Sequence, residues 1–154
     1  RFEKIGDYPI KDGTATLYDD YGHHPTEVQA TIQAVRDGWA DQRLVMIFQP
    51  HRYTRTRDLY EEFVGVLSTV DVLLVLDVYS AGEEVIGGAT SKTLCGSIRQ
   101  RGHIDPIYVA NLEDVPELLA ELVKDGDLVM TQGAGSVSKL VSMLADSQLG
   151  QVPL

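Results

Sequence analysis

Residues 44–58 read Leu-Val-Met-Ile-Phe-Gln-Pro-His-Arg-Tyr-Thr-Arg-Thr-Arg-Asp, so an apolar run leads directly into a cluster of arginines. The run Leu44–Phe48 is short for a helix and typical of a strand that is buried on both faces of a parallel sheet. Arg52, Arg55 and Arg57 follow within six positions, in a chain whose overall charge is negative. This stretch therefore predicts a buried strand that ends at a local concentration of positive charge.

The arginine cluster indicates a binding site for an anion. A guanidinium group is planar and can donate two parallel hydrogen bonds to a carboxylate or a phosphate. A solvated basic turn at the start of a helix is the structural alternative. Cations in the first turn of a helix oppose its dipole, however, so the arrangement lowers stability unless an anion is present.

The rest of the chain alternates between strand and helix patterns. Val28, Ile32, Val35 and Trp39, for example, recur on one face of a helix that begins at Pro25. Such alternation predicts an α/β fold with an open, mostly parallel sheet that carries helices on both faces. The predicted strands are 14–18, 44–48, 72–78, 107–109 and 128–131, and the predicted helices are 25–39, 59–70, 91–101, 115–123 and 137–144.

The length of 154 residues predicts a single domain over 1–154, although the order of the strands cannot be derived from the pattern. Gly6 and Pro9 interrupt residues 1–13, which we expect to form an irregular hinge that leads into the first strand. Residues 147–154 show little periodicity, and we expect this tail to fray.

Composition excludes several classes of function. The net charge of −10 and the pI of about 4.7 argue against a general binder of nucleic acid or of anionic membranes, so any anionic ligand is expected to be small. No run is apolar and long enough to span a bilayer. Cys95 is the single cysteine; it is best interpreted as a small apolar filler, and its isolation favours a reducing, cytoplasmic location.

The unusual polar residues follow the predicted strands rather than precede them. They form four loops, 19–24, 49–57, 79–83 and 133–136, each at the carboxyl end of a strand. Ligands of open parallel sheets bind beyond these ends. The one-sided distribution therefore predicts that a site lies at this edge of the sheet.

The first and third of these loops offer hydrogen-bonding groups whose interpretation stays open. Asp19 and Asp20 could bind a ribose diol or could cap a turn. The pair His23-His24 could ligate a metal, but the sequence supplies no suitably spaced third ligand, so we expect no metal site. Tyr79 and Glu83 could bind a ligand or belong to a solvated loop.

The glycine loop Gly133-Ala134-Gly135-Ser136 could cradle a phosphate at the start of the last helix. A tight strand-to-helix turn also needs glycine, so this signal is weak. The full dinucleotide fingerprint and any Walker-type loop are absent from the sequence. The chain by itself is therefore not expected to hold a triphosphate and Mg²⁺.

Two other functional classes fit less well. A flavodoxin-like or receiver-like binding module would leave the arginines unexplained, and a receiver needs a lysine beyond its phosphorylated aspartate. Asp77 ends a strand, but no lysine follows the last strand before Lys139. A small hydrolase would need a Gly-x-Ser-x-Gly elbow, and Ser136 has no evident base.

Two long motifs resemble the Mur ligase family. They are Asp-Asp-Tyr-Gly-His-His-Pro-Thr-Glu at 19–27 and Phe-Gln-Pro-His-Arg-Tyr-Thr-Arg-Thr-Arg-Asp-Leu-Tyr at 48–60, supported by Val-Tyr-Ser-Ala-Gly-Glu at 78–83 and Gln-Gly-Ala-Gly-Ser at 132–136. The resemblance covers nearly the whole chain and is narrowest to the members that add L-alanine to UDP-N-acetylmuramate. It implies a Rossmann-like C-terminal domain of a longer, three-domain enzyme.

The resemblance also implies an activity in peptidoglycan precursor synthesis. ATP, with Mg²⁺, activates the muramyl carboxylate as an acyl phosphate, and the amine of L-alanine attacks it. The preceding domains of the family bind UDP-N-acetylmuramate and ATP with its metal, so the isolated chain is expected to be inactive.

Matching motif residues carry expected roles. Arg52 and Arg55 are expected to hold the carboxylate of L-alanine, in a pocket lined by Tyr21, His23 and His51. On the ATP side, Asp20 is expected at the ribose, Arg1 at the hinge, and Gly135 and Ser136 near the nucleoside. No residue of this chain is expected to be a covalent catalyst. Thr90 stands where family members often have Asp, which leaves the role of its loop undetermined.

Overall fold

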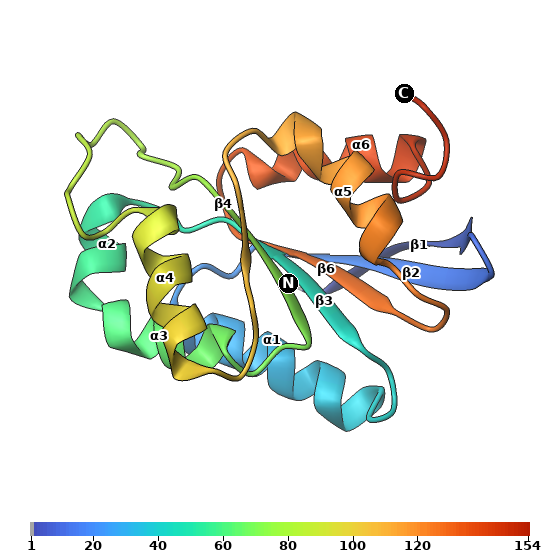
Figure 1. Ribbon diagram of the computed structural model, residues 1–154, viewed down its shortest axis with the longest axis horizontal. Coiled ribbons are helices and arrows are strands. Elements are labelled where there is room, and N and C mark those ends of the chain that lie inside the picture. The colour runs from blue at the N-terminus through green and yellow to red at the C-terminus, as the bar shows by residue number, and fades with distance from the viewer. Residues whose placement is uncertain (1) are drawn as a thin grey trace.

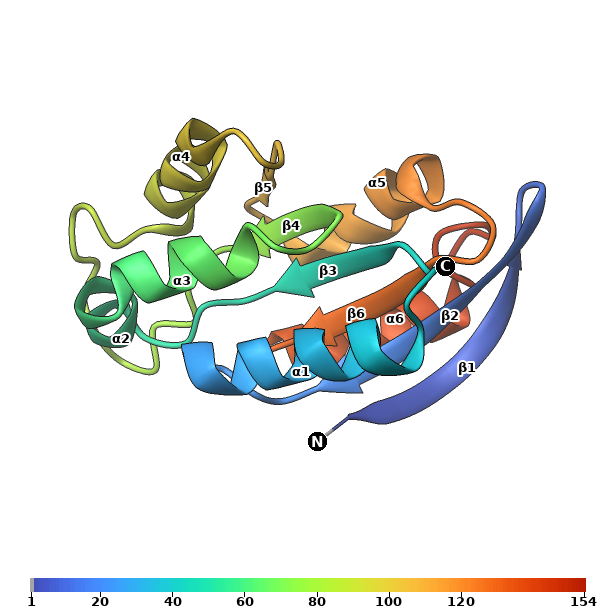
Figure 2. The same cartoon turned by 90° about the horizontal axis from the view of Figure 1, so that it is seen from below.

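The computed structural model describes residues 2–154 and contains a six-stranded sheet in the order β1-β2-β6-β3-β4-β5 (Figures 1 and 2). Strand β1 is antiparallel to β2, and all other neighbouring pairs are parallel. The strands are β1 Glu3–Ile10, β2 Gly13–Asp20, β3 Leu44–Phe48, β4 Val72–Leu76, β5 Ile107–Val109 and β6 Leu128–Gln132. The predicted α/β class with an open, mostly parallel sheet is confirmed.

Helices cover both faces of the sheet. One face is covered by the helices α1 Pro25–Gly38, α3 Tyr60–Leu67 and α4 Ser91–Arg101, which form the first hydrophobic core with the sheet. The other face is covered by α5 Val115–Leu122 and α6 Val137–Asp146, which form the second core (Figures 1 and 2). Successive residues of β3 point to opposite faces, so Met46 belongs to the first core and Ile47 to the second. A short helix, α2 Tyr53–Asp58, and a 3₁₀ turn, η1 Leu112–Asp114, complete the described elements.

Two terminal predictions were wrong. The supposedly irregular lead-in contains β1, which pairs with β2 through a turn at Asp12, a residue with a positive φ of 66°. Pro9 is compatible with this strand because β1 lies at the sheet edge, where a missing N–H is tolerated. The tail does not fray as a whole, since Leu149 is fully buried in the second core and Gln151 accepts a hydrogen bond from the backbone of Lys11.

The arginine stretch also differs from its prediction. Instead of an irregular segment before one long helix, it contains α2, and a break at Leu59 separates α2 from α3. Strand β2 is longer than predicted, whereas β4 ends earlier, at Leu76. These shifts leave the polar loops at the carboxyl ends of their strands.

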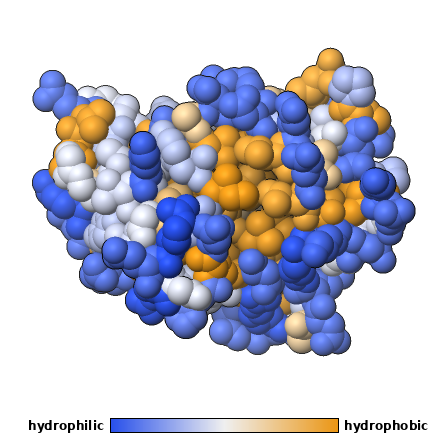
Figure 3. Space-filling view, viewed as in Figure 1, coloured by the Kyte–Doolittle hydropathy of each residue, from blue (hydrophilic) through white to orange (hydrophobic). Residues whose placement is uncertain are grey.

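The strand order places those ends together. Strands β2, β6, β3 and β4 are consecutive neighbours and run parallel, so their carboxyl ends meet at one edge of the sheet. A different surface lies between α4 and α5, where Figure 3 shows apolar side chains gathered. The fold therefore brings four polar loops to a single edge, as their sequence positions predicted.

Candidate functional site

Backbone hydrogen bonds continue beyond the strand ends and join the four loops. Gly133 donates to the carbonyl oxygen of Asp20 at 3.0 Å, and Gln49 donates to that of Gln132 at 3.0 Å. Farther out, the Arg52 N–H donates to the Tyr79 carbonyl oxygen at 2.8 Å. The residues predicted from separate stretches are thus held in one connected layer.

Arg52 is the N-cap residue that precedes α2, and its backbone has φ 75° and ψ 137°, a conformation that is rare for a residue with a side chain. The helix start is capped by Glu83, from the loop after β4. The Glu83 carboxylate accepts hydrogen bonds from the Thr54 N–H at 3.1 Å and from its hydroxyl at 2.5 Å. Both hydrogen bonds lower the pKa of Glu83, and the bond from the Thr54 hydroxyl has the larger effect.

The Arg52 side chain is 46% exposed, and its Nη1 lies 4.0 Å from Oε2 of Glu83. Glu83 therefore has two effects on the arginine: it fixes the helix start, and it places a negative charge nearby. Because the guanidinium remains accessible, it can receive a carboxylate from solution.

Arg55 and His51 form the second cationic element. The Nη1 atom of Arg55 donates to the His51 carbonyl oxygen at 3.0 Å and lies 3.1 Å from Nδ1 of the His51 ring. A guanidinium only donates, so Nδ1 is the acceptor and the ring is neutral with its proton on Nε2. Partial burial, followed by the charges of His23, Arg55 and Arg52, lowers the pKa of His51 accordingly.

Aromatic rings surround His51. Its ring lies 4.9 Å from that of His23 and 5.4 Å from that of Tyr79, the latter in a stacked arrangement. The Nδ1 atom of His23 lies 3.2 Å from the carbonyl oxygen of Tyr21, a residue that is 59% exposed. The first and second loops are therefore packed against each other through their histidines.

A cavity of about 350 Å³ adjoins this cluster. Arg52 and Arg55 line it together with Asp58, His24, Thr54 and Leu59. Guanidinium groups and a carboxylate on one cavity wall suit a small ligand that carries both signs of charge.

Asp20 lies on the other side of the first loop. It is 8% exposed and its Oδ1 accepts hydrogen bonds from the Gly22 N–H at 2.7 Å and from Nε2 of Gln132 at 3.2 Å. It also lines a cavity of about 360 Å³ with Phe2, Tyr21 and residues of α1. Asp19 is different, because its carboxylate accepts from Thr131 and burial raises its pKa.

The glycine loop packs closely around a buried glutamine. Oε1 of Gln49 accepts from the Val137 N–H at 2.8 Å, and its Nε2 donates to the Ser136 hydroxyl at 2.8 Å. A Cβ atom on Gly135 would lie 2.5 Å from Cγ of Tyr79. The N–H at Val137 that a phosphate would use is therefore already bonded, and close packing accounts for Gly135.

The structure brings most of the predicted residues together. Tyr21, His23, His51, Arg52 and Arg55 belong to contiguous loops, while Asp20 and the glycine loop lie at the same sheet edge. Arg1 lies outside the described residues. His24 caps α1 through its Nδ1, and within residues 2–154 no group of three His, Cys, Asp or Glu side chains could hold a metal ion.

Sequence reasoning missed two residues that organise the site, Gln49 and Gln132. Gln49 is almost fully buried and directly follows β3, whereas Gln132 is fully buried and is the last residue of β6, the neighbouring strand. The available signal was a carboxamide at the end of a mostly apolar strand or directly after it, where the sheet is expected to be buried. Such a buried amide needs protein partners.

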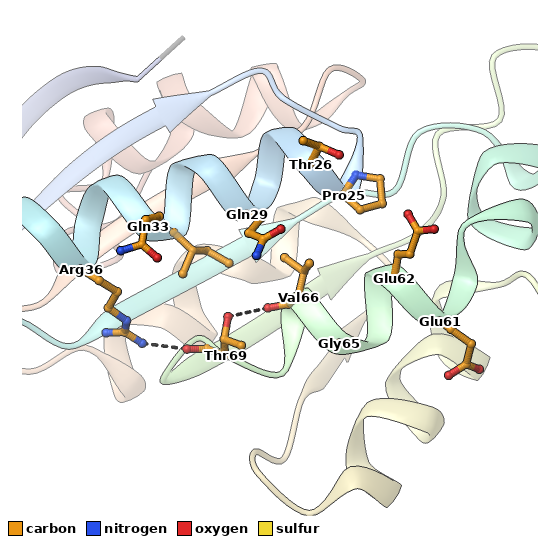
Figure 4. A pocket seen from close by; sticks show the side chains of 11 residues that line it. Pro25, Thr26, Gln29, Gln33, Arg36, Glu61, Glu62, Gly65, Val66 and Thr69 are labelled. Atoms are coloured by element: carbon orange, nitrogen blue, oxygen red, sulfur yellow. Dashed lines mark hydrogen bonds between the residues drawn. The ribbon is translucent and has the colours of Figure 1, made fainter.

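A third cavity lies between α1 and α3, away from the strand ends, and has a volume of about 430 Å³ (Figure 4). Ile32 and Val66 supply apolar contacts, and the Arg36 guanidinium donates to the Thr69 carbonyl oxygen at 2.8 Å.

Over residues 2–154, no helix is long and apolar enough to cross a membrane.

Comparisons with known proteins show the family and the fold of this chain. The family described as Mur ligase, glutamate ligase domain, matches residues 1–135. The fold is similar to the UDP-N-acetylmuramate-alanine ligase MurC of Thermotoga maritima, with a TM-score of 0.68 and 22% identity, over 87% of this chain and 26% of that chain. It is also similar to the murein peptide ligase of Psychrobacter arcticus, with a TM-score of 0.70 and 18% identity, over 99% of this chain and 30% of that chain.

A third similar structure is a separate domain, from a Haemophilus ducreyi protein described as a UDP-N-acetylmuramate:L-alanyl-γ-D-glutamyl-meso-diaminopimelate ligase. The TM-score is 0.70 at 20% identity, over 96% of this chain and 98% of that one. The chain thus spans 26% of the length of MurC and 30% of the murein peptide ligase, but nearly all of this single domain.

Proposed function

Because this chain belongs to the Mur ligase family, we propose that it is the amino-acid-binding domain of an ATP-dependent ligase that joins L-alanine to UDP-N-acetylmuramate. The reaction forms an amide between the muramyl carboxylate and the amine of alanine, through an acyl phosphate. Mur ligases act in peptidoglycan synthesis, and the motifs at 19–27 and 48–60 are the part of the sequence that favours the alanine-adding members.

The observation that carries the proposal is the pairing of Arg52 and Arg55 beside the neutral ring of His51. Alanine offers little apolar surface, so its recognition depends on charge-assisted hydrogen bonds. Two guanidinium groups around one cavity can bind its carboxylate, and a neutral imidazole adds no charge that would repel the amine. Tyr21 and His23 do not line this cavity; they lie in the adjoining loop, beside His51, and would approach alanine from there.

This geometry contributes to the reaction by position rather than by covalent chemistry. A carboxylate held at two points fixes the direction of the attached amine, and such orientation is worth about 7–11 kcal/mol in favourable cases. The exposed site edge would be covered when the acyl group approaches, and exclusion of water would protect an activated carboxyl from hydrolysis.

Only part of the nucleotide fits the described residues. Asp20 has the carboxylate and the cavity needed for a ribose diol, with Gly135 and Ser136 nearby at the same edge. Residues 2–154 offer less for the triphosphate and Mg²⁺, because the Val137 N–H is bonded to Gln49 and no group of three His, Cys, Asp or Glu side chains among them could hold a metal ion, so we assign these groups to another part of the enzyme. When bound, ATP supplies the phosphoryl group that activates the carboxylate, and this chain would contact the nucleoside alone.

The decisive experiment measures phosphate release by the natural protein that contains this chain. UDP-N-acetylmuramate, ATP with Mg²⁺ and a panel of single amino acids would be supplied in turn. Phosphate release and a new amide product with L-alanine, well above those with glycine, D-glutamate or meso-diaminopimelate, are the expected result. Activity only with another amino acid would refute the alanine assignment.

A second candidate is a ligase that attaches a ready-made peptide. The reason to consider it is that two structures described as ligases of this kind match the fold as well as MurC does, with TM-scores of 0.70 against 0.68. Adding L-alanyl-γ-D-glutamyl-meso-diaminopimelate to the same panel separates the two. A ligase for this tripeptide would use it at least as well as alanine.

A further inference from the structure

Gln132, at the end of the central strand β6, has an unusual set of hydrogen bonds. Its side chain is fully buried, and Nε2 donates to Oδ1 of Asp20 at 3.2 Å and to the carbonyl oxygen of Gly22 at 2.7 Å. Within residues 2–154, its Oε1 has no hydrogen-bond partner. A buried acceptor without a donor lowers stability.

The orientation of this amide follows from its neighbours. Both groups beside Nε2 are oxygens that only accept, a carboxylate and a carbonyl, so rotating the amide by 180° would set Oε1 against them. The same rotation would lose both hydrogen bonds. The unpaired Oε1 is therefore the consequence of directing Nε2 at Asp20 and Gly22.

The effect of Gln132 is to fix the Asp20 carboxylate. Oδ1 accepts from the Gly22 N–H and from Gln132, so two donors on different elements hold one carboxylate oxygen. The space is tight, because a Cβ atom on Gly22 would lie 2.9 Å from Oδ1 of Asp20 and 3.0 Å from Nε2 of Gln132. The carboxylate cannot rotate without breaking this junction.

We infer that Gln132 is a positioning residue that holds Asp20 for the ribose hydroxyls of the nucleotide. The inference rests on the proposed function, which gives Asp20 the ribose contact, and it assigns to Gln132 an action through Asp20. The unpaired Oε1 lowers the stability of the fold, and this loss accompanies the orientation of Nε2 toward Asp20. An apolar side chain of similar length would fill the site without that loss, but would remove the hydrogen bond that Gln132 donates to Oδ1 of Asp20.

The test is Gln132→Met in the natural protein that contains this chain. Because the substitution removes an unpaired acceptor together with two hydrogen bonds, we expect the melting temperature to change by less than about 4 °C. The KM for ATP should rise about five- to tenfold, and the KM for L-alanine should rise less. Gln29→Met, on the exposed face of α1, is the matched control and should change neither constant.

Ribose recognition is read from analogues. The wild type should prefer ATP over 2′-deoxy-ATP, 3′-deoxy-ATP or both by about tenfold or more in kcat/KM, because each analogue lacks one partner of Asp20. Gln132→Met should reduce that preference to within about threefold. Gly22→Ala, which presses on the same junction from the other side, should reduce it as well and gives a second test if the first variant fails to fold.

The outcomes separate this inference from the proposed function. Wild-type discrimination retained in Gln132→Met, or a wild type that accepts both deoxy analogues like ATP, overturns the positioning role while ligase activity stands. A fall in activity that follows a loss of folded protein, with discrimination unchanged in the folded fraction, also overturns it. A wild type without ATP-dependent ligation refutes the proposed function itself.

Discussion

The guanidinium of Arg55 lies 3.0 Å from the carbonyl oxygen of His51 and 3.1 Å from Nδ1 of its ring, so one arginine holds both the backbone and the side chain of the residue four positions before it. This pair determines the charge state of the site. The imidazole stays neutral, and the positive charge remains on the arginines, where a carboxylate can use it.

Arg52→Ala and Arg55→Ala should each raise the KM for L-alanine about 10- to 100-fold, because each removes a charge-assisted hydrogen bond worth about 1.5–3 kcal/mol. The KM for ATP should change much less. Arg57→Ala is the control, since Arg57 lies in the same helix but pairs with Asp58 at the surface. An alanine KM that is unchanged in both arginine variants would eliminate the carboxylate clamp.

Acid should weaken both stability and alanine binding through His51. Its pKa is lowered from 6.5 in the folded protein, so below pH 6.5 the unfolded chain binds a proton at this position that the folded chain resists. The free energy of unfolding should therefore fall as the pH drops from about 7 toward the folded pKa, and the alanine KM should rise because a protonated Nδ1 cannot accept from Arg55. Urea titrations at pH 7.5 and 5.5 measure the first effect.

In His51→Gln the same comparison should show a smaller loss, because the titrating group is gone and the other histidines are unchanged. Equal losses in the variant and the wild type would show that His51 does not control the acid response.

Gly135→Ala should destabilise the chain by about 1–3 kcal/mol, since the new methyl group would overlap Tyr79 and the Gln49 carboxamide. Gly96→Ala, in α4, is the matched control: among the described residues nothing lies within 4 Å of the added Cβ, so better helix propensity should stabilise by up to about 1 kcal/mol. Chemical denaturation of both variants checks the pair, and similar behaviour would contradict the packing explanation.

The domain expressed alone should fold but should not release phosphate when supplied with all three substrates. Among residues 2–154, the Val137 N–H at the glycine loop is bonded to Gln49, and no group of three His, Cys, Asp or Glu side chains could hold a metal ion. Circular dichroism confirms folding, and a coupled phosphate assay gives the rate. Turnover by the isolated chain would show that the phosphate site lies within it.

Several parts of this fold could be predicted because one signal dominated locally. Leu44–Phe48 is apolar at every position, and a strand buried on both faces is the simplest structure for it. Strand β1 was missed because Gly6 and Pro9 are strand breakers, and its stability comes from pairing with β2, a contact that no local pattern contains. Leu149 was missed for the same reason, since a single apolar residue in the tail shows no periodicity.

The site divides in the same way. Arg52 and Arg55 could be proposed as site residues because clustered charge in an acidic chain is conspicuous, whereas Gln49 and Gln132 are neutral and resemble ordinary loop residues. Their roles depend on the strand order, which places β6 between β2 and β3. The alternation of strands and helices predicts the common edge, but only the order shows which loops can share a hydrogen bond.

Two substitutions of Glu83 can separate its two effects on Arg52, which are the capping of α2 and the negative charge beside the guanidinium. Glu83→Ala removes the cap of α2 and the negative charge 4.0 Å from Arg52, so the melting temperature should fall by a few degrees and the alanine KM should rise as the helix start loosens. Glu83→Gln keeps an acceptor for Thr54 but removes the competing charge, so it should lose less stability and bind alanine at least as well as the wild type does. Glu84→Ala, at the exposed neighbouring position, should leave both quantities unchanged. If Glu83→Gln raises the alanine KM as much as Glu83→Ala does, the negative charge of Glu83 is what orients Arg52, and the capping explanation fails.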